Sequence, residues 1–198
     1  APASALTAYR LSDDSQHVFF IGTDNHVHEL FIDGGSWADN DLTVLAGEEM
    51  AAQQRLAERT HTQLTLDSGG NCVAEVDGRR IRRVLRNLIT NAIEHGEGRP
   101  ITVYVRGDEN AVAVAVRDHG VGFTAEEGSQ VFNRFWRADP SRGRHGGGTG
   151  LGLSISLEDA RLHGGRLDAW GSPGAGAQFR LTVPRKAAEE LQGSPWPS

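Results

Sequence analysis

Hydrophobic residues between positions 77 and 95 recur with the period of an α-helix. They follow the spacing i, i+3, i+4, i+7, i+8, i+11, i+12, which places all of them on one face. The residues are Ile81, Val84, Leu85, Leu88, Ile89, Ala92 and Ile93. Asp77 stands directly before them, where an aspartate can cap the first backbone N–H groups. The pattern predicts an amphipathic helix packed on a core.

Short runs typical of β-strands lie on both sides of this helix. Predicted strands cover 61–67, 71–77, 101–106, 111–117, 166–170 and 177–183. Good helix formers with few apolar positions over 48–60 predict a connecting helix. A second core helix begins in the glycine-rich stretch 146–153 and continues to about Leu162, where His163-Gly164-Gly165 ends it.

The first 47 residues have a different pattern. The stretch HVFFIGTDNHVHELFI contains two β-rich runs around a turn at 23–25, and Trp37 follows a Gly-Gly turn. This predicts a meander of short strands that is too small to hold a core alone. We therefore divide the chain into a meander (1–47), a connecting helix (48–60), a larger domain (61–184) and a tail (185–198).

Composition excludes several classes of function. The net charge of −6 and the pI of about 5.7 argue against a nucleic-acid-binding protein. The single Cys72 excludes an internal disulfide and a cysteine-based zinc site. No run reaches the roughly 18 apolar residues that a membrane helix needs. The 25 glycines of the 198 residues gather mainly in 143–152 and 164–176, which suggests close approach of the backbone to a ligand.

The first candidate site lies on the predicted helix. Asn87 and Asn91 are one helical turn apart, and His95 continues their face. An amide oxygen can hold Mg²⁺ against phosphate oxygens without adding charge. Two isolated asparagines on a helix would more simply be solvated or capping residues, but the motifs downstream favour the metal.

A turn follows the strand predicted at 111–117. In Asp118-His119-Gly120-Val121-Gly122, the carboxylate can accept a hydrogen bond from the exocyclic amine of adenine. The two glycines let the backbone approach the ring closely. By itself the motif also fits a simple turn.

Residues 123–149 have no strong periodicity. Phe132, Phe135 and Trp136 stand there among arginines and glycines. A loop of this length is usually functional or disordered, and we interpret it as a lid over a nucleotide with the aromatics as its hinge packing. The arginines that could reach phosphates, or equally remain solvated, are Arg134, Arg137, Arg142 and Arg144.

The run Gly146–Leu153 opens the second core helix. Backbone N–H groups at a glycine-rich helix start bind phosphate. The run is not a P-loop, because no Lys-Ser/Thr follows, and no strand leads directly into it as a dinucleotide fingerprint requires. Together the motifs predict a pocket for ATP and Mg²⁺.

In the order RVLRNLITNAIEH, RDHGVGF, FNRFWR and GGGTGLGLSI, these blocks resemble the N, G1, F and G2 boxes of sensor histidine kinases. The resemblance covers 61–184 and is to their catalytic ATP-binding domain, of the GHKL or Bergerat superfamily. It implies an α+β fold, a two-layer α/β sandwich of three helices over a mixed sheet. The N-terminal antiparallel β-meander precedes it.

The resemblance also implies residue roles. Asn91 would hold Mg²⁺, Asn87 would assist at the phosphates, and Asp118 would bind adenine. Hydrolysing relatives carry Glu where Asn87 stands, so little ATP hydrolysis is expected, and Glu94 replaces a common Lys. The implied nucleotide-binding residues are Asn87, Asn91, His95, Asp118, Gly120, Gly122, Phe132, Arg134, Arg137, Gly148, Thr149, Gly150, Leu151 and Gly152.

The phosphoacceptor histidine of that family lies in an H-E-x-R-T-P context. None of the eight histidines has it; His61 follows Glu58-Arg59-Thr60 in the wrong order. We therefore expect no catalytic residue in cis. Phosphate transfer would need an acceptor helix domain in trans, with a response regulator downstream, on the cytoplasmic side of the membrane in a parent kinase. The absence favours a truncated or engineered fusion.

The N-terminal segment resembles one blade of a lectin-type β-propeller, on the residues HVFFIG, HVHEL and Trp37. Repeat units need neighbours, so this predicts a homo-oligomer through residues 1–47, or packing on the larger domain. By the resemblance Arg10, Glu29 and Trp37 are glycan candidates, although Trp37 also fits blade core. Two other functions stay open: a lectin-type assembly carrying the kinase domain as cargo, and a serine kinase of the anti-sigma type.

Overall fold

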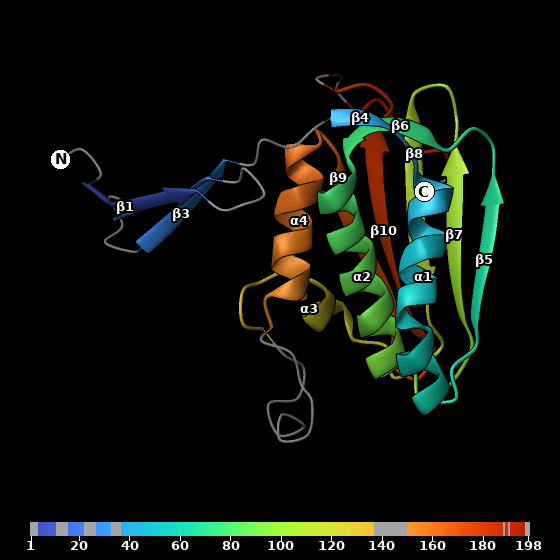
Figure 1. Cartoon of the computed structure of the whole chain (residues 1–198). Helices are drawn as coiled ribbons and strands as arrows, with labels where there is room; N and C mark the ends of the chain where they lie inside the picture. Colours follow the sequence, from blue (N-terminus) through green and yellow to red (C-terminus); the bar gives the residue numbers. More distant parts are fainter. Residues whose placement is uncertain are drawn as a thin grey trace. The chain divides into compact units, whose positions relative to one another are not determined.

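A computed structural model describes residues 4–10, 16–21, 27–32, 37–136, 150–187, 189 and 191–196. The chain forms two compact units, Ala1–Ser36 and Trp37–Ser198 (Figure 1). None of the helices in the described ranges is both long enough and apolar enough to span a bilayer.

The first unit is a small antiparallel sheet. Its strands β1 (Ser4–Arg10), β2 (Gln16–Ile21) and β3 (Val27–Ile32) pair in the order β1-β2-β3. The two β-rich runs expected around the turn at 23–25 are β2 and β3, so that prediction is confirmed.

The second unit is built on a five-stranded sheet in the order β5-β7-β8-β10-β9. The edge strand β5 is parallel to β7, and all other neighbours are antiparallel, so the sheet is mixed. The strands are β5 (Leu64–Gly69), β7 (Ile101–Gly107), β8 (Ala111–Arg117), β9 (Arg166–Ser172) and β10 (Gly176–Pro184).

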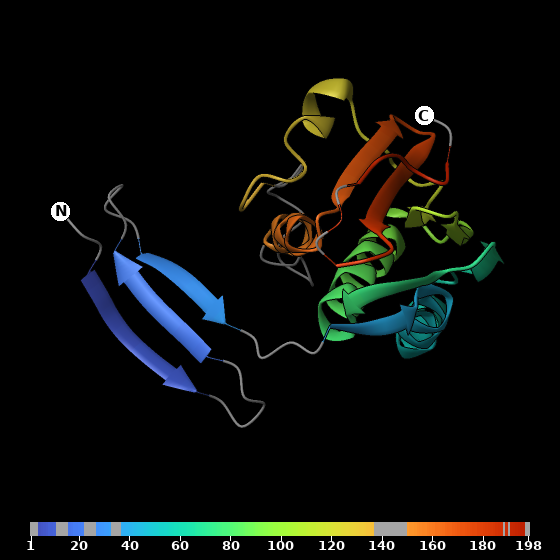
Figure 2. The same cartoon turned by 90° about the horizontal axis from the view of Figure 1, so that it is seen from above.

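Three helices cover one face of this sheet (Figures 1 and 2). They are α1 (Leu42–Arg59), α2 (Gly78–His95) and α4 (Gly152–Leu162), with α2 between the other two. The two-layer sandwich with three helices over a mixed sheet is therefore confirmed. All seven residues of the predicted apolar stripe on α2 are buried, and the Asp77 side chain caps the helix by accepting from the N–H groups of Arg79 and Arg80.

The start of the second unit differs from the sequence-based division. Strand β4 (Trp37–Asp41) pairs antiparallel with β6 (Val73–Asp77), and α1 begins at Leu42 rather than at residue 48. Three of the five buried residues of α1 lie where the sequence suggested a meander: Leu42, Leu45 and Ala46. The other two, Glu49 and Ala57, lie in the predicted helix. Because α1 packs on α2 and β5, it is part of the sandwich rather than a connecting helix.

The structure differs from the sequence-based prediction at two further places. Strand β5 begins at Leu64, because His61 turns the chain after α1 with a φ of 57°. Within the predicted lid, α3 (Ala125–Gly128) forms a single turn of helix. A capping box stabilises it, since the side chains of Thr124 and Glu127 each accept from the other's backbone N–H.

Candidate functional site

Asp118 follows β8 directly and its side chain is only 3% exposed. Its Oδ1 accepts hydrogen bonds from the N–H groups of Gly120 (2.9 Å) and Ala177 (3.1 Å). Two backbone donors thus fix the orientation of the carboxylate. Both bonds end on Oδ1, so Oδ2 can accept a hydrogen bond from a ligand, as an adenine amine would require.

The glycines of this turn are needed by the protein's own backbone. A Cβ on Gly120 would lie 1.8 Å from the carbonyl oxygen of His95, at the end of α2. Gly122 has a φ of +63°, and a Cβ there would lie 2.0 Å from the carbonyl oxygen of Ser172. The Val121 N–H also donates to the His95 carbonyl (3.1 Å). The turn is therefore pressed between the end of α2 and the β9–β10 turn.

Asn87 links α2 to the first turn of α4. Its Nδ2 donates to the carbonyl oxygen of Gly152 and to Oγ of Ser156, both at 3.0 Å. The amide nitrogen is thereby occupied, and Oδ1 is the atom that could face a cation. Asn91 lies half-buried one turn further along α2, and His95 ends the helix as an exposed residue.

The glycine loop enters the described structure at Gly150, whose φ is +71°. Leu151 occupies the N-cap position of α4, and no side chain in the described part of the chain caps the helix there. The first N–H groups of α4, from Gly152 onwards, are thus without a side-chain partner in those residues. Such N–H groups form an anion site at a helix start.

The predicted lid is tied to both the core and this loop. Phe132 packs on Phe179 with ring centroids 6.3 Å apart, which fits the expected hinge packing. Phe135 instead is 71% exposed, has a φ of 63°, and donates its N–H to the Gly150 carbonyl (3.0 Å). Arg134 is exposed. The predicted contacts Arg137, Arg142, Arg144, Gly148 and Thr149 lie outside the described residues.

No group of three or more His, Cys, Asp or Glu side chains within the described ranges could hold a metal ion. Magnesium prefers oxygen ligands and keeps several waters. Asn91, one turn from Asn87 on α2, offers an amide oxygen of the kind that such an ion takes.

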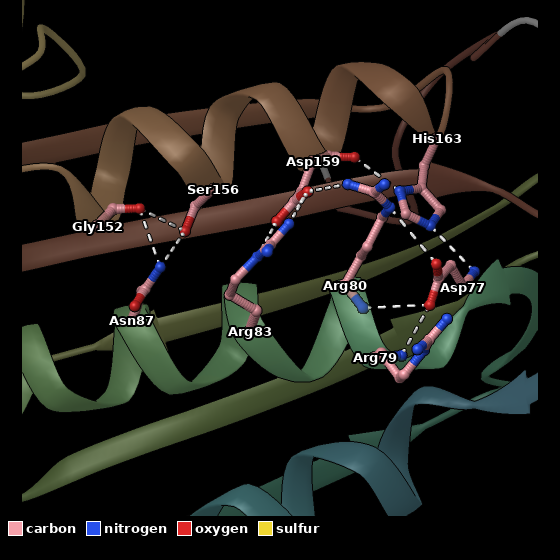
Figure 3. A network of polar contacts seen from close by, with 9 residues as sticks. All are labelled: Asp77, Arg79, Arg80, Arg83, Asn87, Gly152, Ser156, Asp159 and His163. Atoms are coloured by element: carbon pink, nitrogen blue, oxygen red, sulfur yellow. Dashed lines mark hydrogen bonds and ion pairs between the residues drawn. The ribbon is translucent and has the colours of Figure 1, made fainter. Parts of the chain in front are cut away.

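Sequence reasoning missed a polar interface between α2 and α4 (Figure 3). Asp159, 1% exposed, receives the fork of Arg83, with Nε–Oδ2 at 2.8 Å and Nη2–Oδ1 at 2.7 Å. Arg80 adds an Nη1–Oδ1 contact at 3.1 Å and also pairs with Asp77. Each of the two helices has a row of polar residues in the sequence. That these two rows face each other follows only from the packing of α2 on α4.

His163 closes the far end of this interface. Its Nε2 accepts a hydrogen bond from the Asp77 N–H (3.1 Å), and its Nδ1 donates to the Asp159 carbonyl (2.6 Å). That arrangement requires the neutral ring. Burial lowers the pKa of His163 below its usual 6.5, against smaller opposing effects of the Asp159 carbonyl and the nearby Asp77 and Asp159 charges.

We expect this burial to make the second unit less stable as the pH falls. Below about pH 6.5 the unfolded chain binds a proton at His163 that the folded chain resists, so the free energy of unfolding decreases until the folded-state pKa is reached. All four tryptophans, Trp37, Trp136, Trp170 and Trp196, belong to the second unit, so their fluorescence reports its urea unfolding.

His163→Gln should flatten the acid side of that stability curve, because an amide does not titrate. The exposed His119→Gln is the matched control and should leave the wild-type slope. Equal slopes between pH 5 and 7 in wild type and His163→Gln would contradict the assignment.

The three glycan candidates do not share one unit. Arg10 lies in β1 and Glu29 in β3, whereas Trp37 begins β4 of the second unit. The Trp37 ring packs on His163, with centroids 4.7 Å apart, and is 41% exposed. Trp37 therefore packs on the end of α4 and is not part of the N-terminal sheet.

Comparison with known proteins gives a family and relatives for this chain. A family model described as "Histidine kinase-, DNA gyrase B-, and HSP90-like ATPase" matches residues 76–187. Sensor histidine kinase MtrB of Mycobacterium leprae is 51% identical over 158 residues, and MtrB of Mycolicibacterium paratuberculosis is 59% identical over 158 residues. These matches cover 79% of this chain but 28% of each relative's length.

A solved structure shares the fold. The catalytic domain of histidine kinase ThkA, in a nucleotide-free form, aligns with a TM-score of 0.66 at 24% sequence identity. The alignment covers 76% of this chain and 98% of that domain.

Proposed function

This chain belongs to the histidine kinase-, DNA gyrase B- and HSP90-like ATPase family, and on that basis we propose that its second unit binds ATP with Mg²⁺ for a sensor histidine kinase. The observation that carries the proposal is the bond from Asn87 to Gly152, which joins the asparagine helix to the glycine loop across 65 residues of sequence. Two motifs that are separate in the chain are thereby held side by side, which supports a single site.

Each group in this site has a separate task in the proposal. The Oδ2 atom of Asp118 accepts a hydrogen bond from the adenine amine, and the N–H groups at the start of α4 bind phosphate oxygens. The amide oxygen of Asn91 holds Mg²⁺, and Asn87 assists at the phosphates. When bound, ATP would supply the phosphoryl group and Mg²⁺ would offset the negative charge of its phosphates. An amide is a poor base, so Asn87 cannot draw a proton from water, and slow hydrolysis follows.

The experiment that tests the proposal is calorimetric titration with a non-hydrolysable ATP analogue, with and without Mg²⁺. We expect Asn91→Ala to weaken binding by about 10-fold in the presence of Mg²⁺ and to change it little in EDTA, because the lost oxygen serves the metal. Asn110→Ala, in the turn between β7 and β8, is the matched control. Binding that ignores both Mg²⁺ and Asn91 would contradict the proposed metal role.

Phosphate transfer is a proposal about a longer protein. The acceptor would be a histidine on a helix domain supplied in trans, and a response regulator would receive the phosphate, with the domain on the cytoplasmic side of the membrane. The 51% identity to sensor histidine kinases favours this over a serine kinase of the anti-sigma type. Acid treatment of a labelled acceptor separates the two, because phosphohistidine is acid-labile and phosphoserine is not.

The lectin-type role of the first unit stays a prediction. The specific observation behind it is the three-stranded antiparallel sheet β1-β2-β3. A ring of such units would give an oligomer several times the 21.3 kDa chain mass, together with retention on a glycan column. A monomer without retention would exclude the assembly role.

A further inference from the structure

The contact between α2 and α4 is polar along its length (Figure 3). Arg80, Arg83 and Asn87 follow one another at three- and four-residue spacing on α2, and so share one face. The facing positions of α4 have the same spacing: Gly152, Ser156, Asp159 and His163. The sandwich therefore joins these two helices by specific hydrogen bonds and ion pairs, which have only one correct register.

Asp159 is the centre of this interface. Its two oxygens accept three N–H groups, two from Arg83 and one from Arg80, at 2.7–3.1 Å. The Asp159 side chain is 2% exposed and that of Arg80 13%, whereas that of Arg83 is 40% exposed. Such an ion pair adds little net stability, because the buried carboxylate loses its hydration. Its better-attested effect is to fix how two elements align, since any shift leaves a buried charge without its partner.

The same interface leads to the phosphate end of the site. Asn87 stands one turn beyond Arg83 on α2, and donates to the Gly152 carbonyl and to Ser156. Ser156 in turn donates its hydroxyl to the Gly152 carbonyl (2.9 Å). Asp159 lies two helical turns from Gly152, or about 10 Å along α4, so it does not itself reach the phosphates.

We propose that Asp159 is a positioning residue for phosphate binding. Held by Arg83 and Arg80, it sets the position of α4 along α2 and so fixes the N–H groups at Gly152 relative to Asn87. This positioning role rests on the proposed nucleotide site, which Asp159 supports without touching the nucleotide.

The adenine end provides an internal reference. Asp118 is held by Gly120 and Ala177, neither of which belongs to α4. A shift of α4 should thus weaken phosphate binding and spare adenine. General destabilisation would instead weaken both.

The test compares Mg²⁺-ADP with adenosine on the full chain, by calorimetric competition. We expect Asp159→Asn to lose about 10-fold in ADP affinity while adenosine affinity stays unchanged, as with other indirect supports of a binding group. Arg83→Lys keeps the charge but loses the two-donor fork, and should give the same selective loss to a smaller extent. Glu158→Gln is the matched control, because its pair with Arg161 (2.9 Å) is exposed on the same helix.

The outcomes are separable. An unchanged ADP-to-adenosine ratio in folded Asp159→Asn would overturn the positioning role and leave the proposed function intact. If that variant does not fold, Arg83→Lys decides by the same ratio. Wild-type protein that binds neither ligand would overturn the proposed function, and the positioning role with it.

Discussion

Asp118→Asn is expected to reduce ATP affinity by about 10- to 100-fold while the domain remains folded. In the variant, Oδ1 can still accept from Gly120 and Ala177, because both partners are N–H donors. The amide NH₂ then replaces Oδ2. A donor would face the adenine amine where an acceptor stood, and a lost charged hydrogen bond costs about 1.5–3 kcal/mol, or roughly one to two decades of affinity.

The same substitution should change base preference. Inosine triphosphate carries a carbonyl in place of the adenine amine and can accept from the new NH₂ group. The ratio of ATP to ITP affinity should therefore fall strongly in Asp118→Asn. Calorimetry with both nucleotides measures it, and Asp67→Asn, an exposed carboxylate of β5, is the control.

Asp118→Ala should be more severe, because the turn also loses the oxygen that holds its two N–H groups. Unchanged ATP binding in both Asp118 variants would remove adenine recognition from this residue. An unchanged ATP-to-ITP ratio alongside weaker binding would assign Asp118 to the shape of the turn instead.

The sequence predicted those parts of the fold in which local pattern and burial agree. The α2 stripe is apolar, helical in period and wholly buried, so its place in the core followed directly. The strands β7 and β8 were predicted at 101–106 and 111–117, and the structure pairs them as a hairpin. At both elements, local preference and tertiary packing favour the same structure.

Other parts depend on partners that are distant in sequence. The segment Trp37–Asp41 looks like part of a meander, and only its pairing with β6 places it in the second unit. The arginines of α2 are plain in the sequence, yet Asp159 lies 76 residues beyond Arg83. A charge pattern on one helix does not indicate which opposite charge will face it, because that depends on how the helices pack.

Among the candidate site residues, some could be identified from local sequence, whereas the reason for others depends on the fold. Asp118 and Asn87 were found because their chemistry follows from residue type and local context, and the structure gives each a fixed orientation. The glycines Gly120 and Gly122 were explained by approach to a ligand, whereas the closest atoms at their missing Cβ positions are backbone atoms of the protein. Sequence shows that a glycine is needed, but the neighbour that requires it is a property of the fold.

Gly120→Ala tests whether this glycine is required by the protein's own backbone or by a ligand. The substitution should destabilise the second unit by about 3 kcal/mol, near the upper end for overpacking. Its Cβ would lie 1.8 Å from the His95 carbonyl oxygen and 2.6 Å from Gly96 Cα. Both are backbone atoms, so no side-chain rotation can relieve the clash. Either the end of α2 or the Asp118 turn must move, and nucleotide binding should weaken as well.

Urea unfolding followed by tryptophan fluorescence measures the change in stability. Gly47→Ala is the matched control, because the position is inside α1 and a Cβ there meets only Leu66 Cδ2 at 3.8 Å. That variant should be more stable than wild type by up to about 1 kcal/mol, from helix propensity alone. If Gly120→Ala were as stable as wild type but failed to bind nucleotide, the glycine would serve the ligand, and the sequence-based explanation would hold.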